Sequence, residues 1–135
     1  MINSNIIKIA SITKNVGLKK DYTHKSSLKN SICGDFIEAE FILDDSKIIS
    51  MRYETDSCIL CEASASLFSR KIKNFKIQEA KKEIKKLIDI KKREDCVFPH
   101  KFREFNQLIS KKNINRLNCV ILPMEAFLKA FNVKK

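Results

Sequence analysis

Residues 37–54 of the chain read IEAEFILDDSKIISMRYE, and this stretch decides the fold. Apolar side chains alternate with mostly polar ones on both sides of the turn-forming triplet DDS at 44–46. A period of two residues is that of a strand with one buried face, so the pattern predicts an antiparallel hairpin of residues 36–43 and 47–54. The side chains expected to face the core are Ile37, Ala39, Phe41, Leu43, Ile49, Met51 and Tyr53.

The hairpin is flanked by less regular sequence. We expect a short helix over residues 5–13, an extended polar loop over 15–31 and a third short strand near 53–57.

After Cys58 the apolar residues take up helical spacing, which predicts helices over 62–72, 77–88 and 102–109. A last helix is expected around Pro123, placed in the first turn because proline lacks the N–H that would be unpaired there. The chain is thus predicted to be one α+β domain over residues 1–135, a small antiparallel sheet of about three strands with helices on one side.

The composition indicates a globular protein with a basic surface. Of 135 residues, 44% are hydrophobic and 32% charged, and 27 Lys and Arg against 16 Asp and Glu give a net charge of +11. Only five of these cations are Arg, which favours a solvated Lys-rich surface, with an acidic protein partner or nucleic acid as alternatives. No apolar run approaches the roughly 20 residues of a membrane span, and no signal peptide is recognised, which predicts a cytoplasmic protein without a membrane partner.

Five cysteines lie at positions 33, 58, 61, 96 and 119. An odd, scattered set in a cytoplasmic chain favours metal ligands or reactive thiols over disulfides. Cys33 and Asp35 are two positions apart, so in extended backbone their side chains point to the same side. Cys58 and Cys119 are each expected where a helix begins, which lowers a thiol pKa. Three thiolates and one carboxylate complete a tetrahedral set for zinc, and buried structural cysteines are the alternative.

Four motifs occur in a telling order: Lys14-Asn15-Val16-Gly17, then Ile32-Cys33-Gly34-Asp35, then Cys58-Ile59-Leu60-Cys61-Glu62-Ala63-Ser64-Ala65-Ser66, then Cys119 at a helix start. This order resembles the NifU/IscU/SufU family of iron–sulfur scaffold and sulfur-acceptor proteins over residues 5–131. The SufU type is favoured, because Cys58 and Cys119 are 61 positions apart and Arg116 stands three positions before Cys119. Asn118 occupies the position where IscU types carry His.

The chain also departs from the family pattern. Ser57 replaces the Gly that usually precedes the second cysteine. Cys61 is not a family ligand and is interpreted as a spare thiol, although its Cys-x2-Cys spacing with Cys58 makes it an alternative zinc ligand. Cys96 has no family counterpart and is interpreted as structural. The two histidines, His24 and His100, match no ligand position, and the phenylalanines at 98, 102 and 105 are expected to pack the inserted segment.

The resemblance implies a role on the sulfur side of iron–sulfur cluster assembly. The protein would accept persulfide sulfur from a PLP-dependent cysteine desulfurase of the SufS kind and pass it to downstream cluster assembly proteins. Zinc would be held by Cys33, Asp35, Cys58 and Cys119. SufU-type proteins use the first of these cysteines as acceptor, which is Cys33, whereas IscU-type scaffolds use the third, which is Cys119. Arg116 would support the charge of the site or of the docked complex.

Two alternatives stay open. The same residues are also those on which a scaffold builds a transient [2Fe–2S] cluster, in which case the protein is a non-enzymatic scaffold rather than a zinc-dependent sulfurtransferase. In IscU-like scaffolds, replacing the aspartate that matches Asp35 makes the cluster more persistent. The other alternative is a zinc-stabilised basic module that binds nucleic acid or another protein. The chain has no Trp on which nucleic-acid bases could stack, which argues against nucleic acid.

Overall fold

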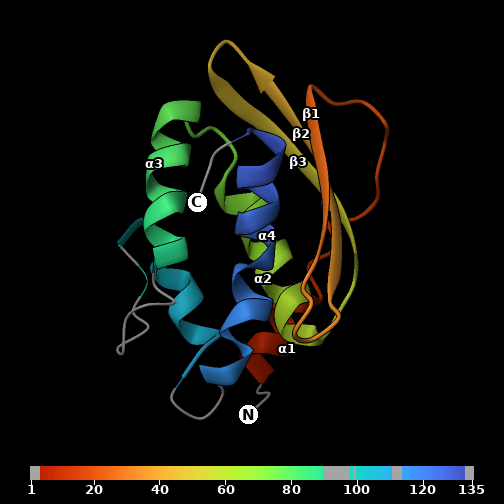
Figure 1. Cartoon of the computed structure of the whole chain (residues 1–135), viewed down its shortest axis with the longest axis vertical. Helices are drawn as coiled ribbons and strands as arrows, with labels where there is room; N and C mark the ends of the chain where they lie inside the picture. Colours follow the sequence, from red (N-terminus) through yellow and green to blue (C-terminus); the bar gives the residue numbers. More distant parts are fainter. Residues whose placement is uncertain (1–3, 90–97, 99, 111–113, 133–135) are drawn as a thin grey trace.

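The structure is a computed structural model that describes residues 4–89, 98, 100–110 and 114–132. Three strands form one antiparallel sheet in the order β1-β2-β3, and α2 and α4 pack against one face of it (Figure 1). The predicted α+β class and the predicted hairpin, now β2 and β3, are both confirmed. The elements are α1 (Ser4–Ala10), β1 (His24–Lys29), β2 (Phe36–Asp44), β3 (Lys47–Asp56), α2 (Ile59–Lys71), α3 (Ile77–Ile88), the 3₁₀ helices η2 (His100–Gln107) and η3 (Ile114–Arg116), and α4 (Leu117–Ala130).

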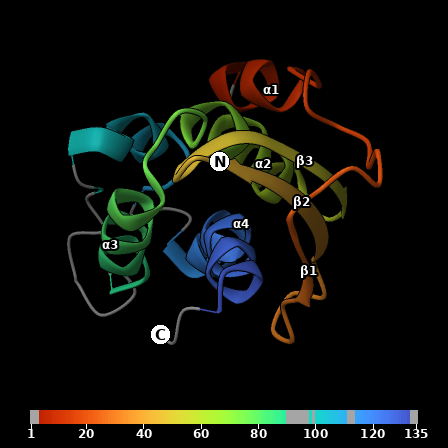
Figure 2. The ribbon, with the colours of Figure 1, turned by 90° about the horizontal axis from the view of Figure 1, so that it is seen from above.

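The apolar core lies between the inner face of the sheet and the helices. α3 packs against α4 on the side away from the sheet (Figure 2), and its helically spaced apolar residues are all buried as predicted. Burying side chains of this size contributes about 1.5–3 kcal/mol each relative to leaving them exposed. The buried residues of α3 are Ile77, Ala80, Ile84, Leu87 and Ile88.

The third strand is β1, within the segment that the sequence predicts to be a loop, and not residues 53–57, most of which continue β3. The sequence of β1, HKSSLK, lacks the β-branched and aromatic residues that mark strands. Its inward side chains are held by partners far along the chain. The His24 ring stacks on Phe131 at 4.2 Å between centroids, and Ser26 Oγ donates to the carbonyl of Ala126 at 2.6 Å.

Three other local predictions need correction. Ile49 is 40% exposed and Ile48 is buried instead, because a bulge after Ile42 shifts the register of the hairpin and reverses the alternation there. Pro123 lies inside α4 rather than in its first turn, since the helix begins at Leu117. Residues 102–109 do not form a separate α-helix, and the helical segment there is the 3₁₀ helix η2, which is kinked at Phe102.

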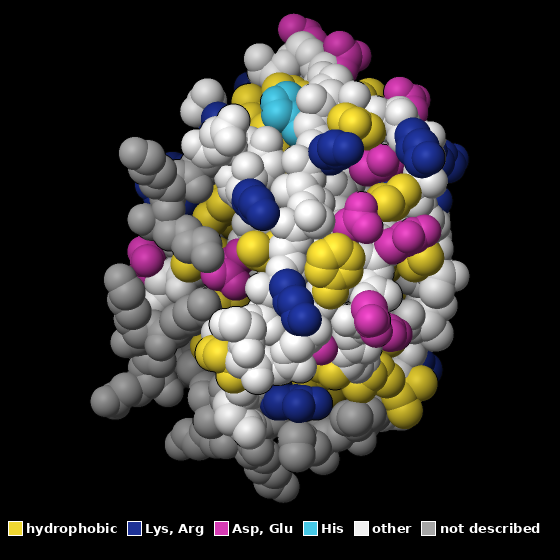
Figure 3. All heavy atoms as spheres, turned by 45° about the vertical axis from the view of Figure 1, so that its right-hand side comes forward, with side chains coloured by type: hydrophobic (Ala, Val, Ile, Leu, Met, Phe, Trp, Pro, Cys, Tyr) yellow, Lys and Arg dark blue, Asp and Glu magenta, His cyan; other side chains and the backbone are white. Residues whose placement is uncertain are grey.

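The outer face of the sheet carries a clamp for the backbone of residues 16–20. Glu40 and Arg52 are cross-strand partners on β2 and β3. Glu40 Oε1 accepts hydrogen bonds from the amides of residues 19 and 20 at 3.0 and 3.1 Å, and Arg52 donates to the carbonyls of Val16 and Gly17 at 2.7 and 2.9 Å. Figure 3 shows this side of the molecule, where charged side chains of both signs lie among small hydrophobic areas.

In the described parts of the chain, no helix combines the length and the apolar character needed to cross a membrane. The cytoplasmic location and the assignment of residues 1–135 to one domain both stay predictions.

Candidate metal centre

The site lies where three segments meet at one end of the sheet. The loop between β1 and β2 carries Cys33 and Asp35, Cys58 is the N-cap residue of α2, and Cys119 is in the first turn of α4. The three segments are brought together because β1 and β2 are neighbours in the sheet and because α2 and α4 pack against each other. All four residues predicted as ligands are therefore at the same place.

The loop that carries Cys33 is closed by hydrogen bonds at Asn30. The side-chain Oδ1 of Asn30 accepts a hydrogen bond from the amide of Ile32 at 2.8 Å, and the Asn30 carbonyl accepts one from the amide of Gly34 at 2.7 Å. Gly34 has a φ of +77°, in the left-handed region that side-chain-bearing residues rarely adopt. This turn leaves Cys33 exposed and directs Asp35 inward, where only 6% of its surface is accessible.

Asp35 is the polar centre of the site. Its Oδ1 accepts a hydrogen bond from the amide of Cys58 at 3.1 Å, and its Oδ2 accepts one from the Cys58 thiol at 3.2 Å. Burial acts to raise the pKa of Asp35, but hydrogen bonds from the Cys58, Cys119 and Cys33 thiols and from the Cys58 amide together hold it below its ordinary value. The carboxylate is thus kept ionised among three thiols.

Cys119 contacts the remaining members of the site. Its Sγ is 3.4 Å from Sγ of Cys33, and ligand atoms of Cys33, Asp35 and Cys119 all lie within 4.8 Å of one another. Burial raises the pKa of the Cys119 thiol, and its hydrogen bonds with Cys33, Asp35 and Cys58 raise it further. The surrounding protein therefore favours the protonated thiol until a cation enters to stabilise the thiolate.

The arrangement fits a tetrahedral zinc ion. Zinc–sulfur bonds of about 2.3 Å place two sulfur ligands about 3.8 Å apart, close to the observed 3.4 Å between Cys33 and Cys119. The ligand atoms within 4.8 Å of one another are those of Cys33, Asp35 and Cys119. Cys58 is connected to this group by the hydrogen bond from its thiol to Asp35. Three sulfurs and one carboxylate oxygen are donors that zinc and iron both accept, so the donor set by itself does not select between them.

Arg116 is the N-cap residue of α4, three positions before Cys119. Its Nε is buried and has no hydrogen-bond partner in the described structure. The role of the Arg116 guanidinium beside Cys119 stays a prediction.

The other residues discussed from the sequence are not members of the ligand group. Cys61 is fully buried in the first turn of α2, and burial raises the pKa of its thiol. His24 is stacked in the sheet's far end, and exposed His100 contacts Arg103 in η2. Cys96 lies outside the described residues. Phe98, Phe102 and Phe105 are buried against one another, as predicted.

Comparison with known families decides the assignment. The model of the NifU-like N terminal domain family matches residues 2–100, well over half of the chain. The chain belongs to this family. As a NifU-like protein it belongs to iron–sulfur cluster assembly, which confirms the coarse function expected from the motifs.

Solved structures agree with this fold. The NifU-like chain is similar to a putative iron–sulfur cluster assembly scaffold protein for the SUF system (FiSufU) from Fervidobacterium islandicum AW-1, with a TM-score of 0.83 and 23% identity over 96% of this chain and 95% of that one. It is also similar to a nitrogen-fixing NifU-like protein (N-terminal) from Brucella abortus, with a TM-score of 0.80 and 16% identity over 96% and 91% of the two chains. No curated protein matches the chain.

Proposed function

We propose that this NifU-like protein is of the SufU type and transfers sulfur. It accepts a persulfide from a PLP-dependent cysteine desulfurase of the SufS kind and delivers the sulfur to downstream cluster assembly proteins. The observation that carries the proposal is the convergence of three thiols on the buried carboxylate of Asp35. A persulfide is transferred when a thiolate attacks the outer sulfur of the donor, so several adjacent thiols provide both an acceptor and onward carriers.

Exposure supports Cys33 as the acceptor. The desulfurase carries its persulfide on its own side chain, so the acceptor thiol must be reached from outside. Cys33 is exposed on the loop before β2, whereas Cys119 is only 2% exposed. Cys119 lies 3.4 Å behind Cys33, which suits it to the second position in the transfer.

Zinc is the proposed resident metal, held by Cys33, Asp35, Cys58 and Cys119. Bound zinc would keep its ligand thiols deprotonated. Cys33 would be the ligand that leaves the metal to act as the attacking thiolate, while Asp35 would still accept the hydrogen bond from the Cys58 amide and so hold the shape of the pocket. Arg116 is proposed to balance the negative charge of the thiolates or of the docked desulfurase.

The test is transfer from a desulfurase. The wild-type chain is mixed with enzyme and L-cysteine, alanine production is followed, and persulfides are located by alkylation and mass spectrometry. Cys33→Ala is expected to abolish both the acceleration of alanine production and the persulfide on this chain. Ser31→Ala, an exposed change in the same loop, is the matched control and should transfer like wild type. Full transfer by Cys33→Ala would contradict the proposed acceptor.

The second candidate is a scaffold on which a transient [2Fe–2S] cluster is the cargo. Family membership supports this reading, and the same four residues would hold the cluster. Asp35→Ala separates the two. In sulfur transfer the variant binds zinc more weakly, transfers less and stays colourless, whereas in a scaffold it retains a coloured cluster after anaerobic reconstitution. A wild-type chain that neither stimulates a desulfurase nor gains a persulfide, but binds nucleic acid with a steep salt dependence, would support the basic-module alternative instead.

A further inference from the structure

Cys61 is the described thiol that the four-ligand site leaves unused. It lies three positions after Cys58 in a Cys-x2-Cys pair at the start of α2. Cys58 is the N-cap residue with extended backbone angles (φ −72°, ψ 165°) and makes no capping hydrogen bond through its side chain, whereas Cys61 is fully buried. An accessible thiol at the cap and a buried thiol one turn later are the arrangement in which one sulfur reacts and the second resolves.

The backbone geometry permits a bond between the two sulfurs. Residues three positions apart on a helix have Cβ atoms about 5–6 Å apart, and a disulfide needs its Cα atoms within about 4.4–6.8 Å and its Cβ atoms somewhat closer than the helix sets them. Cys58 precedes the first helical residue, so its side chain is not restricted by a preceding turn.

The four described thiols form a series that begins at the surface with Cys33 and ends in the core with Cys61, with buried Cys119 and half-buried Cys58 between them. Cys33 is exposed, Cys119 lies 3.4 Å from it and is buried, and Cys119 in turn shares a hydrogen bond with Cys58. Cys61 ends the path with no accessible surface. Sulfur that enters on Cys33 can therefore move inward by thiol attack on the outer sulfur of each persulfide, steps in which no net oxidation or reduction occurs.

We propose that Cys61 is a resolving thiol that releases this sulfur as hydrosulfide, an inference that rests on the proposed sulfur transfer. Cys61 attacks the inner sulfur of a persulfide on Cys58. The bond between Cys58 and the outer sulfur breaks, a Cys58–Cys61 disulfide forms, and the outer sulfur leaves as HS⁻ with the proton of Cys61. The Cys61 sulfur is oxidised to the disulfide level, and the outer sulfur is reduced to sulfide, the form that a cluster contains. A small dithiol or a dithiol protein must then reduce the disulfide before the next cycle.

Cys61 suits the role of resolving thiol better than one of the four proposed metal ligands would. A bridge between Cys33 and Cys119 would remove two of the four metal ligands, including both proposed carriers. A Cys58–Cys61 bridge removes only Cys58, and it leaves the ligand atoms of Cys33, Asp35 and Cys119 grouped within 4.8 Å.

The experiment measures sulfide release without added thiol. The full chain is stripped of metal with a chelator and loaded with sulfane sulfur in two ways, by a desulfurase with L-cysteine and chemically by sodium polysulfide. After small thiols are removed, HS⁻ is trapped with a fluorescent bimane reagent, and disulfides are mapped by mass spectrometry. Wild type should release HS⁻ while a Cys58–Cys61 disulfide accumulates. Cys61→Ala should load the same amount of persulfide but release it at least about tenfold more slowly, since the resolving sulfur is gone.

Cys61→Ser is the matched control for packing, because it keeps the size of the buried side chain without its sulfur. It should fold like wild type and release sulfide as slowly as Cys61→Ala. Wild-type release by Cys61→Ser or Cys61→Ala would overturn the proposal, as would a Cys33–Cys119 disulfide as the main product. Failure to load from the desulfurase would contradict the proposed function alone, because polysulfide loading tests Cys61 independently of the enzyme.

Discussion

Two regions of the molecule are stabilised by different kinds of contact. One is the thiol end, which consists of Cys33, Asp35, Cys58 and Cys119. The other is the aromatic segment, which consists of Phe98, Phe102 and Phe105. At the thiol end one buried carboxylate accepts hydrogen bonds from thiols and an amide, and Cys33, the proposed acceptor, is exposed. In the aromatic segment all three rings are buried, and the Phe105 ring packs on those of Phe98 and Phe102, with centroids 5.6 and 6.0 Å apart.

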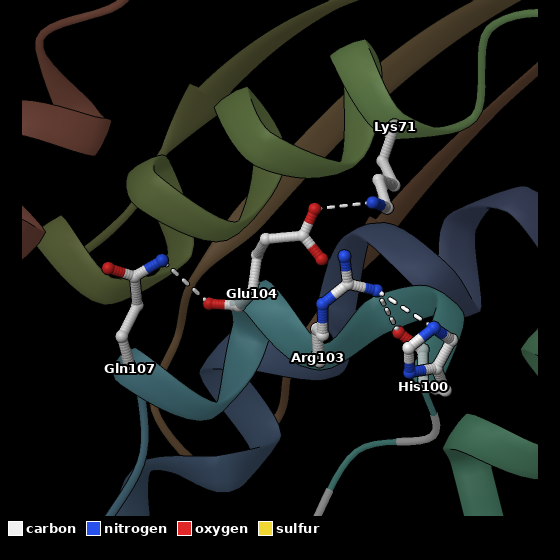
Figure 4. Close-up of polar contacts among 5 residues, drawn as sticks. All are labelled: Lys71, His100, Arg103, Glu104 and Gln107. Carbon is white, nitrogen blue, oxygen red and sulfur yellow. Dashed lines mark hydrogen bonds and ion pairs between the residues drawn. The ribbon is translucent and has the colours of Figure 1, made fainter.

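Polar contacts of the aromatic segment lie at its surface. Figure 4 shows Lys71 of α2 paired with Glu104 of η2, Gln107 donating to the carbonyl of Glu104, and Arg103 donating to the carbonyl of His100. Exposed contacts of this kind contribute little to stability, whereas buried aromatic rings contribute much. The thiol end should therefore be sensitive to charge and backbone geometry, and the aromatic segment should be sensitive to apolar volume.

The largest expected effect is at Phe102. The ring is fully buried and contacts both Phe75 and Phe105. Phe102→Ala should lower the free energy of unfolding by about 3–5 kcal/mol, because it loses apolar burial and leaves a cavity. Urea denaturation measures the loss, and Arg103→Ala on the exposed face of η2 should cost less than about 0.5 kcal/mol. Equal costs for the two variants would contradict the described packing.

Asp35→Asn tests the dependence of the thiol end on one charge. The amide of asparagine cannot replace both carboxylate oxygens as acceptors, so the Cys58 amide or thiol loses its partner. With metal removed by a chelator, the free energy of unfolding should fall by about 1.5–3 kcal/mol, the range for hydrogen bonds to a charged group. Glu38→Gln, which changes an exposed carboxylate on the adjoining strand β2, is the control. A similar small loss in both variants would show that Asp35 does not organise the site.

Gly34→Ala sharpens the role of backbone geometry. A Cβ at this position would meet no other atom within 4 Å, so the cost comes from the φ of +77° alone. About 1–2 kcal/mol of stability should be lost, or the loop should change conformation and zinc affinity should fall. Chemical denaturation and competitive zinc titration measure the two outcomes. Unchanged stability together with unchanged affinity would exclude the left-handed turn.

The smallest effect is expected at the surface ion pair of the aromatic segment. The hydrogen bond from Lys71 is the main cause that holds the pKa of Glu104 below its ordinary value. The stabilisation is therefore present above the unfolded-state pKa and is lost as pH falls through the lower pKa of the folded protein. Because both side chains are partly exposed, Glu104→Gln should cost at most about 0.5 kcal/mol at pH 7. The difference from wild type should shrink as pH falls through the acidic range; a difference that grows toward low pH would reverse the assigned sign.

The sequence by itself determined the parts that depend on local pattern. Alternation predicted β2 and β3, and helical spacing predicted α3, because burial of one face imposes a period on neighbouring residues. The order of the motifs identified the family and located the four residues that the structure brings together. Their roles as ligands or carriers stay predictions.

Only the tertiary structure decided what depends on residues far apart in the chain. β1 has no strand pattern and forms because β2 pairs with it and α4 accepts the Ser26 hydrogen bond, 100 residues away. The exposure of Cys33 and the burial of Cys119 and Cys61 follow from how α2 and α4 pack against the sheet. The sequence does not distinguish an exposed cysteine from a buried one, because the accessibility of a thiol is set by the atoms that the fold places around it.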